Sequence, residues 1–531
     1  MMEKIYYNGK IYRSAGQFAS ALWVRDGKIY RVGGAELAAQ ARDAGIAAED
    51  LRGAAVVPGF NDSHLHLLDA GRLLNQIDLF GVRSEEELAR RCAEFIAARQ
   101  IPAGRTVLGL GWNQDLFDRP ALPTRAALDA AVPEHPLRLD RVCGHIVVCN
   151  TAALNAAGIA PDTPAPAGGS IDWERGILGD NAIALLDPIL PRETVEDVMA
   201  AYQASLPAAA AKGITTAQSC DPRPGDWRTV LQAVRRLDEA GELPVRLHLQ
   251  CALDTPAGLE EFLGQYRPGQ GGRYWEIGQL KLFVDGSLGS RTALLRQGYA
   301  DAPGTRGLQC MTPEQTRAMV ELAGANGMQV IGHAIGDGAI AQLLDAFGEG
   351  ANPLRHGVVH CQITTPDLWQ RFARGNILAF VQPIFLDYDH TIAADRCGAA
   401  LAGTSYAFGT AVRLGVPVSY GTDAPVESFD PFPNLYTAVT RRPLDGSAPW
   451  HPEECVSRET ALDCYTLGGA YAEGREKSKG RLEPGFAADF AVLDRDYFTV
   501  PEEEIPRIQV TCTVMDGREV YRADNNEPEE I

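Results

Sequence analysis

The stretch "PGFNDSHLHLL", residues 58–68, places two histidines, His64 and His66, one residue apart directly after a short apolar run. In a β-strand, residues i and i+2 point to the same face, so both imidazoles would project from one side and could bind one metal ion. Ten histidines among 531 residues would give about 0.2 such pairs by composition alone, so the pair alone is weak evidence. Its position after a strand-like run and a Pro-Gly dipeptide strengthens the hypothesis of a metal site.

Four further residues of suitable chemistry lie at or near the ends of other apolar runs. His333 ends "QVIGH", His360 ends "GVVH", Asp423 ends "VSYGTD", and Lys281 lies within "GQLKLFVDG". Each has a structural alternative: the histidines could be hydrogen-bonded core or rim residues, Asp423 could cap a turn, and Lys281 could extend its amine to water. Together they are harder to explain by accident, and neutral imidazole and carboxylate suit zinc and its neighbours.

A lysine fits among metal ligands only when its amine is neutral. Burial lowers the pKa of a lysine and so favours the neutral amine. A neutral amine can take up CO2 to form a carbamate, whose two oxygens can bridge two metal ions. The sequence supplies the lysine for this modification, Lys281.

The elements that would position these residues are eight short apolar runs, which alternate with helical stretches rich in Ala, Leu and Arg. Eight strands that alternate with helices are typical of a (β/α)8 TIM barrel, an α/β fold whose chemistry lies at the carboxyl ends of the strands. About 145 residues separate the first run from the second, so we predict an inserted subdomain at about 70–210. The runs cover residues 54–66, 213–221, 244–253, 278–286, 327–337, 355–362, 376–385 and 415–426.

Both ends of the chain differ from the middle. Residues 1–57 are strand-like and contain Asn8-Gly9 and Asp26-Gly27, and residues 476–531 contain Asp516-Gly517. These dipeptides suit the positive φ of tight hairpin turns. We therefore expect the two ends to form one small β-structure, which the barrel at 58–475 interrupts.

Composition excludes several classes of partner. The net charge is 49 − 69 = −20, which repels nucleic-acid phosphates and anionic membrane surfaces, so a small-molecule substrate is expected. The eleven cysteines include no C-x-x-C pair, and no apolar stretch approaches a signal peptide or a membrane span. We expect a soluble cytoplasmic protein with reduced thiols, and a homodimer only because dimers are common.

Several motifs together resemble the amidohydrolase superfamily, and more narrowly its amidohydrolase-3 branch of N-substituted formamide deformylase-like proteins. The resemblance covers nearly the whole chain and is carried by "VVPGFNDSHLH", "KLFVDGSLGSRTA", "VIGHAIGDGAI", "VVHCQ", "YGTDAPV" and "GRLEPGFAADFAVLDRD". It implies a TIM barrel flanked by a small β-sandwich built from both termini. It also implies a binuclear site with six ligands, all present here: His64, His66, Lys281, His333, His360 and Asp423. One departure is "VVHCQ", where relatives often have Glu-His before the glutamine.

The resemblance implies cleavage of an amide, N-acyl, N-formyl or cyclic amide C–N bond by a hydroxide that bridges two divalent metals, zinc or else Mn, Fe or Co. Asp423 would take the proton of the attacking hydroxide and pass it to the leaving amine. Asp62 is a candidate for orienting an imidazole, with a turn cap as its alternative. His145 is a candidate for polarising the carbonyl, and Trp112 and Arg291 for contacting substrate, although each could instead be structural.

Three alternatives remain open at this stage. A mononuclear aminohydrolase (deaminase) would not need the bridging Lys281. A non-hydrolytic use of the same site, such as decarboxylation, would keep the ligands. A catalytically silent binding protein on the same scaffold would be favoured by a missing ligand, and none of the six is missing.

Overall fold

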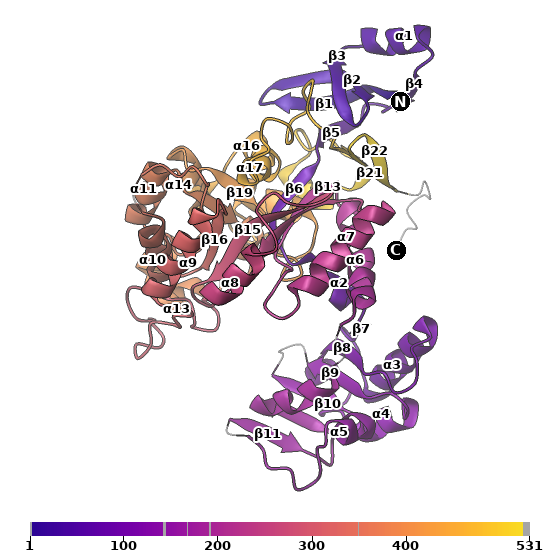
Figure 1. Ribbon diagram of the computed structural model, residues 1–531, viewed down its shortest axis with the longest axis vertical. Coiled ribbons are helices and arrows are strands. Elements are labelled where there is room, and N and C mark those ends of the chain that lie inside the picture. Colours follow the sequence, from indigo (N-terminus) through magenta and orange to yellow (C-terminus); the bar gives the residue numbers. More distant parts are fainter. Residues whose placement is uncertain (1–2, 142–144, 167, 191–192, 349, 524–531) are drawn as a thin grey trace. The chain divides into compact units, whose positions relative to one another are not determined.

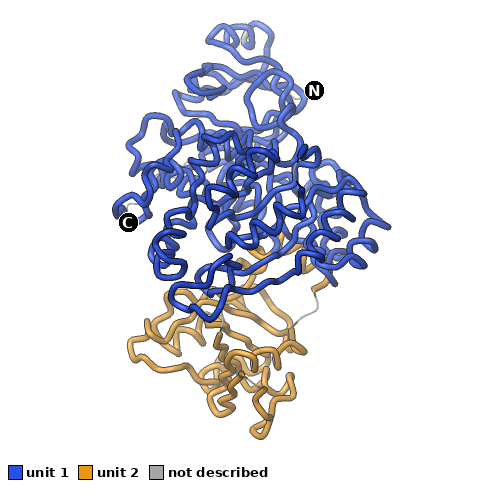
Figure 2. The backbone as a smooth tube through the Cα atoms, turned by 90° about the vertical axis from the view of Figure 1, so that its left-hand side faces the viewer, with its two compact units in different colours: residues 1–68, 205–531 blue, residues 69–204 orange. Residues whose placement is uncertain are grey.

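The computed structural model describes residues 3–523 except 142–144, 167, 191–192 and 349. The chain forms two compact units, coloured separately in Figure 2. Unit 1 comprises residues 1–68 and 205–531, and unit 2 comprises residues 69–204, nearly the range of the predicted insertion. Among the helices of the described ranges, none combines the length and the apolar character needed to cross a membrane.

Unit 1 is built around eight parallel strands, one in each predicted run (Figure 1). The ends of this sheet meet where Ser63 Oγ donates to the carbonyl oxygen of Tyr420 at 2.9 Å and the Asp423 N–H donates to the carbonyl oxygen of His64 at 2.8 Å. The predicted (β/α)8 TIM barrel is therefore confirmed. In order around the barrel, the strands are β6 (Phe60–Leu65), β13 (Ile214–Ser219), β14 (Arg246–Cys251), β15 (Trp275–Phe283), β16 (Val330–Ala334), β17 (Gly357–His360), β18 (Leu378–Val381) and β19 (Val418–Tyr420).

Helices follow the strands, and several of them bury one apolar side. In α7, residues Trp227, Val230, Val234 and Leu237 recur at a spacing of three or four and are buried. A capping box starts α9, where Thr312 and Gln315 satisfy each other's backbone N–H groups. The helices are α7 (Trp227–Ala240), α8 (Pro256–Leu263), α9 (Pro313–Ala325), α10 (Asp337–Phe347), α11 (Pro366–Gly375), α12 (Leu386–Asp389), α13 (Ala393–Ala402), α14 (Phe408–Arg413), α15 (Pro431–Thr440), α16 (Arg458–Tyr465) and α17 (Leu467–Ala472), and α2 (Leu67–Leu74) and α6 (Val195–Ala211) occur where the chain passes from one unit to the other.

Strands from both ends of the chain share a second sheet of unit 1, as the turn dipeptides predict. Its order is β22-β21-β20-β5-β1-β2-β3, and β4 pairs with β1. Tyr6, Leu22, Val56, Phe490 and Val514 meet in its core. The elements are β1 (Glu3–Ser14), β2 (Gln17–Arg25), β3 (Lys28–Gly33), α1 (Glu36–Asp43), β4 (Ala47–Asp50), β5 (Ala55–Pro58), β20 (Phe490–Leu493), β21 (Val510–Met515) and β22 (Arg518–Arg522).

The first predicted run proved to be two strands of different sheets, which corrects its prediction as one barrel strand. β5 pairs with β1 and β20 in the terminal sheet, whereas β6 pairs with β13 in the barrel. The chain changes sheets at Pro58 and Gly59. Pro58 has no N–H to donate, and a Cβ on Gly59 would lie 2.3 Å from Thr215 Oγ1, so only glycine fits this close approach.

Unit 2 has a six-stranded sheet in the order β11-β12-β10-β9-β8-β7. Its core gathers Leu79, Leu88, Trp112, Leu128 and Leu139. The elements are β7 (Ile77–Asp78), α3 (Glu85–Arg99), β8 (Val107–Trp112), α4 (Arg125–Ala131), β9 (Leu137–Arg141), β10 (Ile146–Cys149), α5 (Thr151–Ala156), β11 (Gly169–Asp172), β12 (Ile177–Asp180) and the 3-10 helix η2 (Asn181–Ile189).

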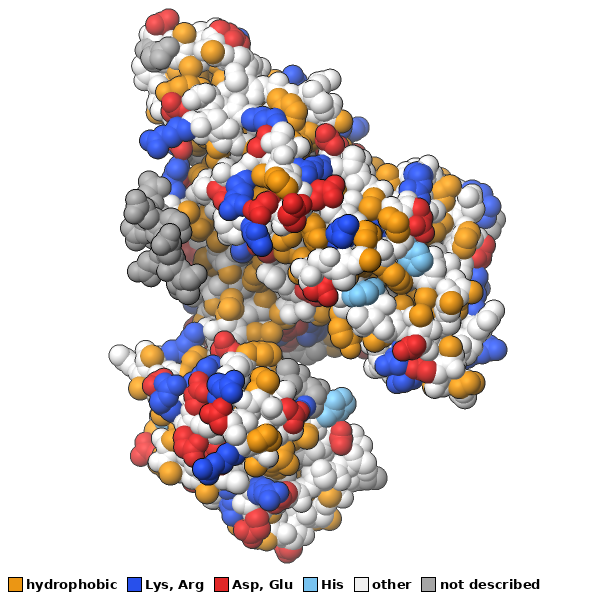
Figure 3. Space-filling view, turned by 180° about the vertical axis from the view of Figure 1, so that it is seen from behind, with side chains coloured by type: hydrophobic (Ala, Val, Ile, Leu, Met, Phe, Trp, Pro, Cys, Tyr) orange, Lys and Arg blue, Asp and Glu red, His pale blue; other side chains and the backbone are white. Residues whose placement is uncertain are grey.

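The surface carries charges of both signs. Figure 3 shows Lys and Arg side chains interspersed with Asp and Glu side chains on one face. On that face the negative net charge is therefore not gathered into a single acidic area.

Candidate metal centre

The structure places the six predicted ligands in unit 1, at or just beyond the carboxyl ends of five barrel strands. This is the end of a parallel barrel where side chains from different strands converge. His64 and His66 come from the end of β6, Lys281 from β15, His333 from β16, His360 from the end of β17, and Asp423 from just beyond β19.

Short distances bring these side chains together. His64 Nε2 lies 3.0 Å from Lys281 Nζ and 3.5 Å from Asp423 Oδ1, and His66 Nε2 lies 3.2 Å from the same carboxylate oxygen. Potential ligand atoms of His64, His360 and Asp423 all lie within 4.8 Å of one another. The ring centroids of His333 and His360 are 4.5 Å apart, so β16, which contains His333, also contributes to the cluster.

Each imidazole has one nitrogen engaged by an oxygen acceptor outside the cluster. Such contacts fix the tautomer and orientation of a metal-binding histidine and leave its other nitrogen for the metal. The pairs are His64 Nδ1 with Gln250 Oε1 at 2.6 Å, His360 Nδ1 with Gln382 Oε1 at 2.9 Å, His333 Nε2 with the Gly286 carbonyl at 3.2 Å, and His66 Nδ1 with the Cys220 carbonyl at 3.3 Å.

Burial keeps three of these histidines neutral. It lowers the pKa of His360 to about 4 and holds the pKa values of His64 and His333 well below the ordinary value. For His66, burial acts in the same direction, but the contacts with Asp423 and Cys220 outweigh it and raise the pKa to about 10. The pKa of Asp423 lies below its usual range, because its contacts with His66, His64 and His360 outweigh the effect of burial.

Lys281 is buried at the centre of the cluster. Burial lowers its pKa, and no carboxylate oxygen of the described residues lies within 4.0 Å of Nζ. An ammonium group here would be desolvated with no carboxylate in direct contact, and the nearby charge of Asp423 does not outweigh the cost of burial. The surroundings therefore favour a neutral amine, the form that can become a carbamate.

The backbone is constrained at two of the ligands. His360 has φ 77° and Asp423 has φ 57°, in the left-handed region that residues other than glycine seldom adopt. Such conformations cost free energy and tend to cluster at functional sites. In addition, Oδ1 of Asp423 is buried and has no hydrogen-bond partner. The donor set and this unpaired oxygen fit divalent metal ions held by imidazole, carboxylate and a modified lysine.

Comparison with known proteins decides the family. The model of the Amidohydrolase family matches residues 47–521. The chain belongs to the amidohydrolase family. It is 33% identical to the Bacillus subtilis protein YtcJ over 98% of this chain and 99% of that one, and 27% identical to N-substituted formamide deformylase of Arthrobacter pascens over 94% of both. A metal-dependent hydrolase of Pyrococcus furiosus superposes with a TM-score of 0.80 at 31% identity, covering 94% of this chain and all of that one.

Membership in the amidohydrolase family confirms the recognition made from the motifs. It also confirms that the chain is an enzyme of the amidohydrolase type.

Asp62 does not orient an imidazole, which corrects that prediction. Its buried carboxylate accepts hydrogen bonds from the N–H and Oγ1 of Thr422 at 3.1 and 2.6 Å, from the His64 N–H at 3.3 Å and from the Tyr465 hydroxyl at 3.3 Å. Burial raises the pKa of Asp62 to about 7 in spite of these bonds. In this amidohydrolase, Asp62 therefore joins the backbones of β6 and the segment after β19.

The three substrate-contact candidates have contacts within their own units, Arg291 in unit 1 and Trp112 and His145 in unit 2. Trp112 is buried in the core of unit 2, where its indole N–H donates to the Leu139 carbonyl at 2.8 Å, so it is a core residue and not a pocket wall. Both oxygens of Asp301 accept from Arg291, at 3.0 and 2.7 Å, which is the structural alternative for that arginine. His145 is exposed in unit 2 with Nδ1 3.2 Å from Asp180 Oδ1, and its catalytic role stays a prediction.

The structure adds residues that sequence reasoning missed. Gln250 and Gln382 hold two of the imidazoles, and both are polar residues that end apolar runs, "RLHLQ" and "LAFVQ". Asp285 accepts from the N–H groups of Leu294 and Gly336, each at 2.9 Å, and lies 3.5 Å from His333 Nε2. The same strand-end rule that found the histidines would have found the two glutamines.

Aromatic rings also flank the cluster. The ring of Phe385 is stacked 6.0 Å from that of His360, and the ring of Phe283 lies 5.8 Å from that of His333. These rings limit water around the imidazoles on their sides of the site.

Proposed function

We propose that this amidohydrolase cleaves a C–N bond in a small amide, an N-acyl, N-formyl or cyclic amide, with two divalent metal ions bound by the six clustered residues. The observation that carries the proposal is Lys281, buried beside His64 with no carboxylate in direct contact and with a pKa that burial lowers. A mononuclear deaminase would have no use for a neutral lysine at this point. The deformylase relative, whose name describes cleavage of an N-substituted formamide, supports the choice of bond.

Zinc is the metal we propose first, because imidazole and carboxylate are its usual partners. His64, His66, His333, His360 and Asp423 would hold the pair of metals, and a carbamate on Lys281 would bridge them. When bound, such metals polarise a carbonyl group and lower the pKa of water to about 7.

Asp423 is the group that we propose moves the proton. It is ionised at neutral pH because its pKa lies below the usual range, and its Oδ1 has no hydrogen-bond partner. A carboxylate in this state can accept a proton from the attacking water and donate it to the leaving nitrogen. The products would be a carboxylic acid and an amine, so that one water is consumed per bond cleaved.

The test is a substrate screen on protein reconstituted with zinc and bicarbonate. N-formyl, N-acyl and cyclic amides of small amines would be assayed for amine release or ring opening, beside aminopurines for ammonia release and aromatic carboxylic acids for CO2 release. Hydrolysis of an amide that is lost in Asp423→Asn supports the proposal. Ammonia release from an aminopurine, or CO2 release with all amides inert, would replace it with the deaminase or the decarboxylase.

A further inference from the structure

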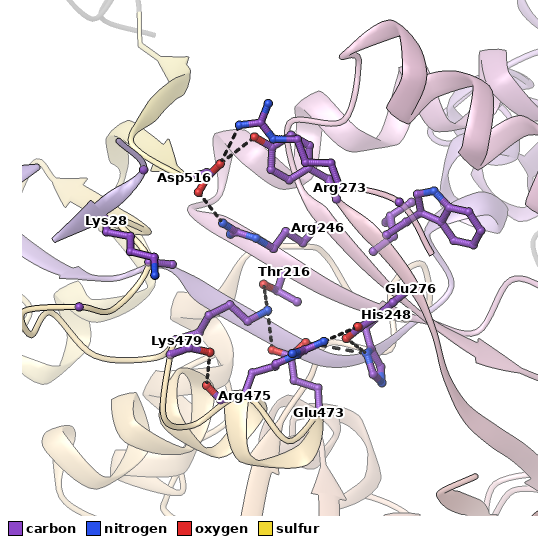
Figure 4. Close-up of a pocket in the computed structure, with 18 residues that line it drawn as sticks. Lys28, Thr216, Arg246, His248, Arg273, Glu276, Glu473, Arg475, Lys479 and Asp516 are labelled. Carbon is purple, nitrogen blue, oxygen red and sulfur yellow. Dashed lines mark hydrogen bonds and ion pairs between the residues drawn. The ribbon is translucent and has the colours of Figure 1, made fainter. Parts of the chain in front are cut away.

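A cavity lies in unit 1 at the opposite end of the barrel from the metal ligands (Figure 4). Its volume is about 300 Å³. Arg246 is the first residue of β14 and Glu276 the second residue of β15, so the cavity lies at the amino-terminal ends of these strands. The terminal sheet contributes Lys28 and the turn residue Asp516.

The lining is rich in cations. Five basic side chains face three carboxylates, and Arg246 also pairs with the carboxylate of Asp489 beside the lining, which leaves a surplus of 5 − 4 = 1 positive charge in a chain whose net charge is −20. A concave site with an excess of one sign of charge attracts ions of the opposite sign. The basic residues are Lys28, Arg246, Arg273, Arg475 and Lys479, and the acidic residues are Glu276, Glu473 and Asp516.

The carboxylates of the lining hold the basic groups in place. Lys479 Nζ lies 2.7 Å from Glu473 Oε1, Arg475 donates to Glu276 at 2.6 Å, and Arg273 lies 3.2 Å from Asp516. Potential ligand atoms of His248, Glu276 and Glu473 also lie within 4.8 Å of one another, but a metal cation there would have to displace Lys479 from Glu473 and Arg475 from Glu276. The dashed lines of Figure 4 follow these contacts.

Two features of the lining call for an acceptor. Lys28 has no carboxylate oxygen within 4.0 Å among the residues that the structure describes. Trp275 is 8% exposed, and its indole Nε1, which can only donate, has no hydrogen-bond partner. An unsatisfied donor is costly, and a ligand with anionic oxygens in the cavity would accept from the Lys28 ammonium group.

We propose that this cavity binds a small organic anion that carries a phosphate group. Fixed arginine and lysine side chains give strong charge-assisted hydrogen bonds to phosphate oxygens. The hydroxyl of Thr216, which accepts from Lys479 Nζ at 3.2 Å, is a further polar contact in the lining. The rings of Tyr274 and Trp275 supply an apolar wall for the organic part of the ligand. This site does not depend on the reaction proposed for the metal centre.

The test is calorimetric titration of inorganic phosphate and of pyrophosphate into the metal-loaded full chain at constant ionic strength. The first variant is Lys28→Glu, at an exposed residue of the lining. Its matched control is Lys477→Glu, which makes the same charge change at an exposed lysine of a nearby loop outside the lining. A second pair is Arg273→Gln with Arg267→Gln as control, since Arg267 is exposed and also outside the lining.

We expect both lining variants to weaken anion binding by about fivefold or more, with the two controls near the unaltered protein. Absence of binding at about 20 mM of either anion would overturn the proposal. Equal binding in all variants would also overturn it, because it would place the anion elsewhere, for example at the metals. Equal loss of anion binding in lining and control variants would show that the overall charge of the protein, and not this cavity, controls binding, and would overturn the proposal.

Discussion

At the level of single residues, the proposed metal centre depends on the oxygen atoms that contact and orient the imidazole rings. Gln382→Leu removes the acceptor 2.9 Å from His360 Nδ1 while keeping a buried side chain of similar size. We expect metal affinity to fall about tenfold, because an imidazole without its outer contact is less well oriented and less basic. Competition with a chromophoric chelator measures this affinity.

Gln279→Leu is the matched control for that variant. Gln279 is also buried in the barrel, but its amide donates to Gln218 at 3.1 Å and not to a ligand. Equal losses of metal affinity in the two variants would mean that barrel packing, and not orientation of His360, is responsible.

Lys281 gives a second prediction at this scale. Lys281→Ala removes the proposed bridge, so we expect loss of about one metal per chain and a fall in kcat of about a hundredfold or more. Added formate or acetate should restore part of both, because a free carboxylate can take the place of the carbamate. Lys212→Ala, which removes a lysine paired with Asp430 at 2.7 Å, should leave metal content unchanged. Full metal content in Lys281→Ala would contradict the bridging role.

The pH dependence of metal binding follows from His66. Its pKa of about 10 in the metal-free site means that His66 carries a proton at neutral pH, which a metal must displace. His360, with a pKa of about 4, is already neutral and contributes no proton. Raising the pH from 6 to 8 should therefore strengthen metal binding by about tenfold per unit, for one proton released. Affinity that does not change with pH would show that His66 is not a ligand.

The identity of the metal ligands was the part of the site that could be predicted from the sequence. Strand-end positions identify His64, Lys281 and Asp423, because the carboxyl ends of barrel strands converge whatever the connecting loops do. Trp112 could not be placed in that way, since its role depends on the packing of unit 2. Asp62 was found, but its partners, Thr422 and Tyr465, are more than 350 residues away in the sequence.

At the element scale, the junction between β5 and β6 carries a stability prediction. Gly59→Ala would place a Cβ within 2.9 Å of three Thr215 side-chain atoms, so Thr215 or the strand must shift. We expect the free energy of unfolding to fall by about 1–3 kcal/mol. Denaturation by urea, followed by circular dichroism, measures this loss.

Two further variants interpret the result at Gly59. Gly304→Ala should have little effect, because no atom lies within 4 Å of the position that its added methyl group would take. Thr215→Gly should recover part of the stability of Gly59→Ala, since it removes the side chain that is struck. Additive losses in the double variant would argue against the contact as the cause.

The number and order of barrel elements followed from alternation of apolar runs and helices, but the division of the first run did not. "AAVVPGFNDSHLH" is apolar on both sides of Pro58-Gly59, so periodicity alone does not show that its halves belong to different sheets. The strands that pair with each half decide to which sheet that half belongs. β20 lies more than 400 residues further along the chain than β5.

At the scale of the whole molecule, the sequence indicated a long insertion but not its internal structure. Unit 2 has its own sheet and its own core, formed by residues 69–204. Its strands are short and mix two kinds of pairing: β8 pairs with β9 in parallel, and β9 pairs with β10 antiparallel. No simple alternation of apolar and polar residues therefore marks them in the sequence. The barrel could be predicted because its strands and helices alternate regularly, whereas the structure of the insertion could not be predicted in this way.

We propose that one chain holds two metals through six residues, one of which is a modified lysine. The most direct test of this proposal is metal content per chain by plasma mass spectrometry, on untagged protein purified without chelator. We predict close to two metals per chain for the full protein and a lower content in Lys281→Ala. Close to one metal in both proteins would contradict the binuclear site, and none after reconstitution with bicarbonate and zinc or manganese would contradict His64 and His66 as ligands.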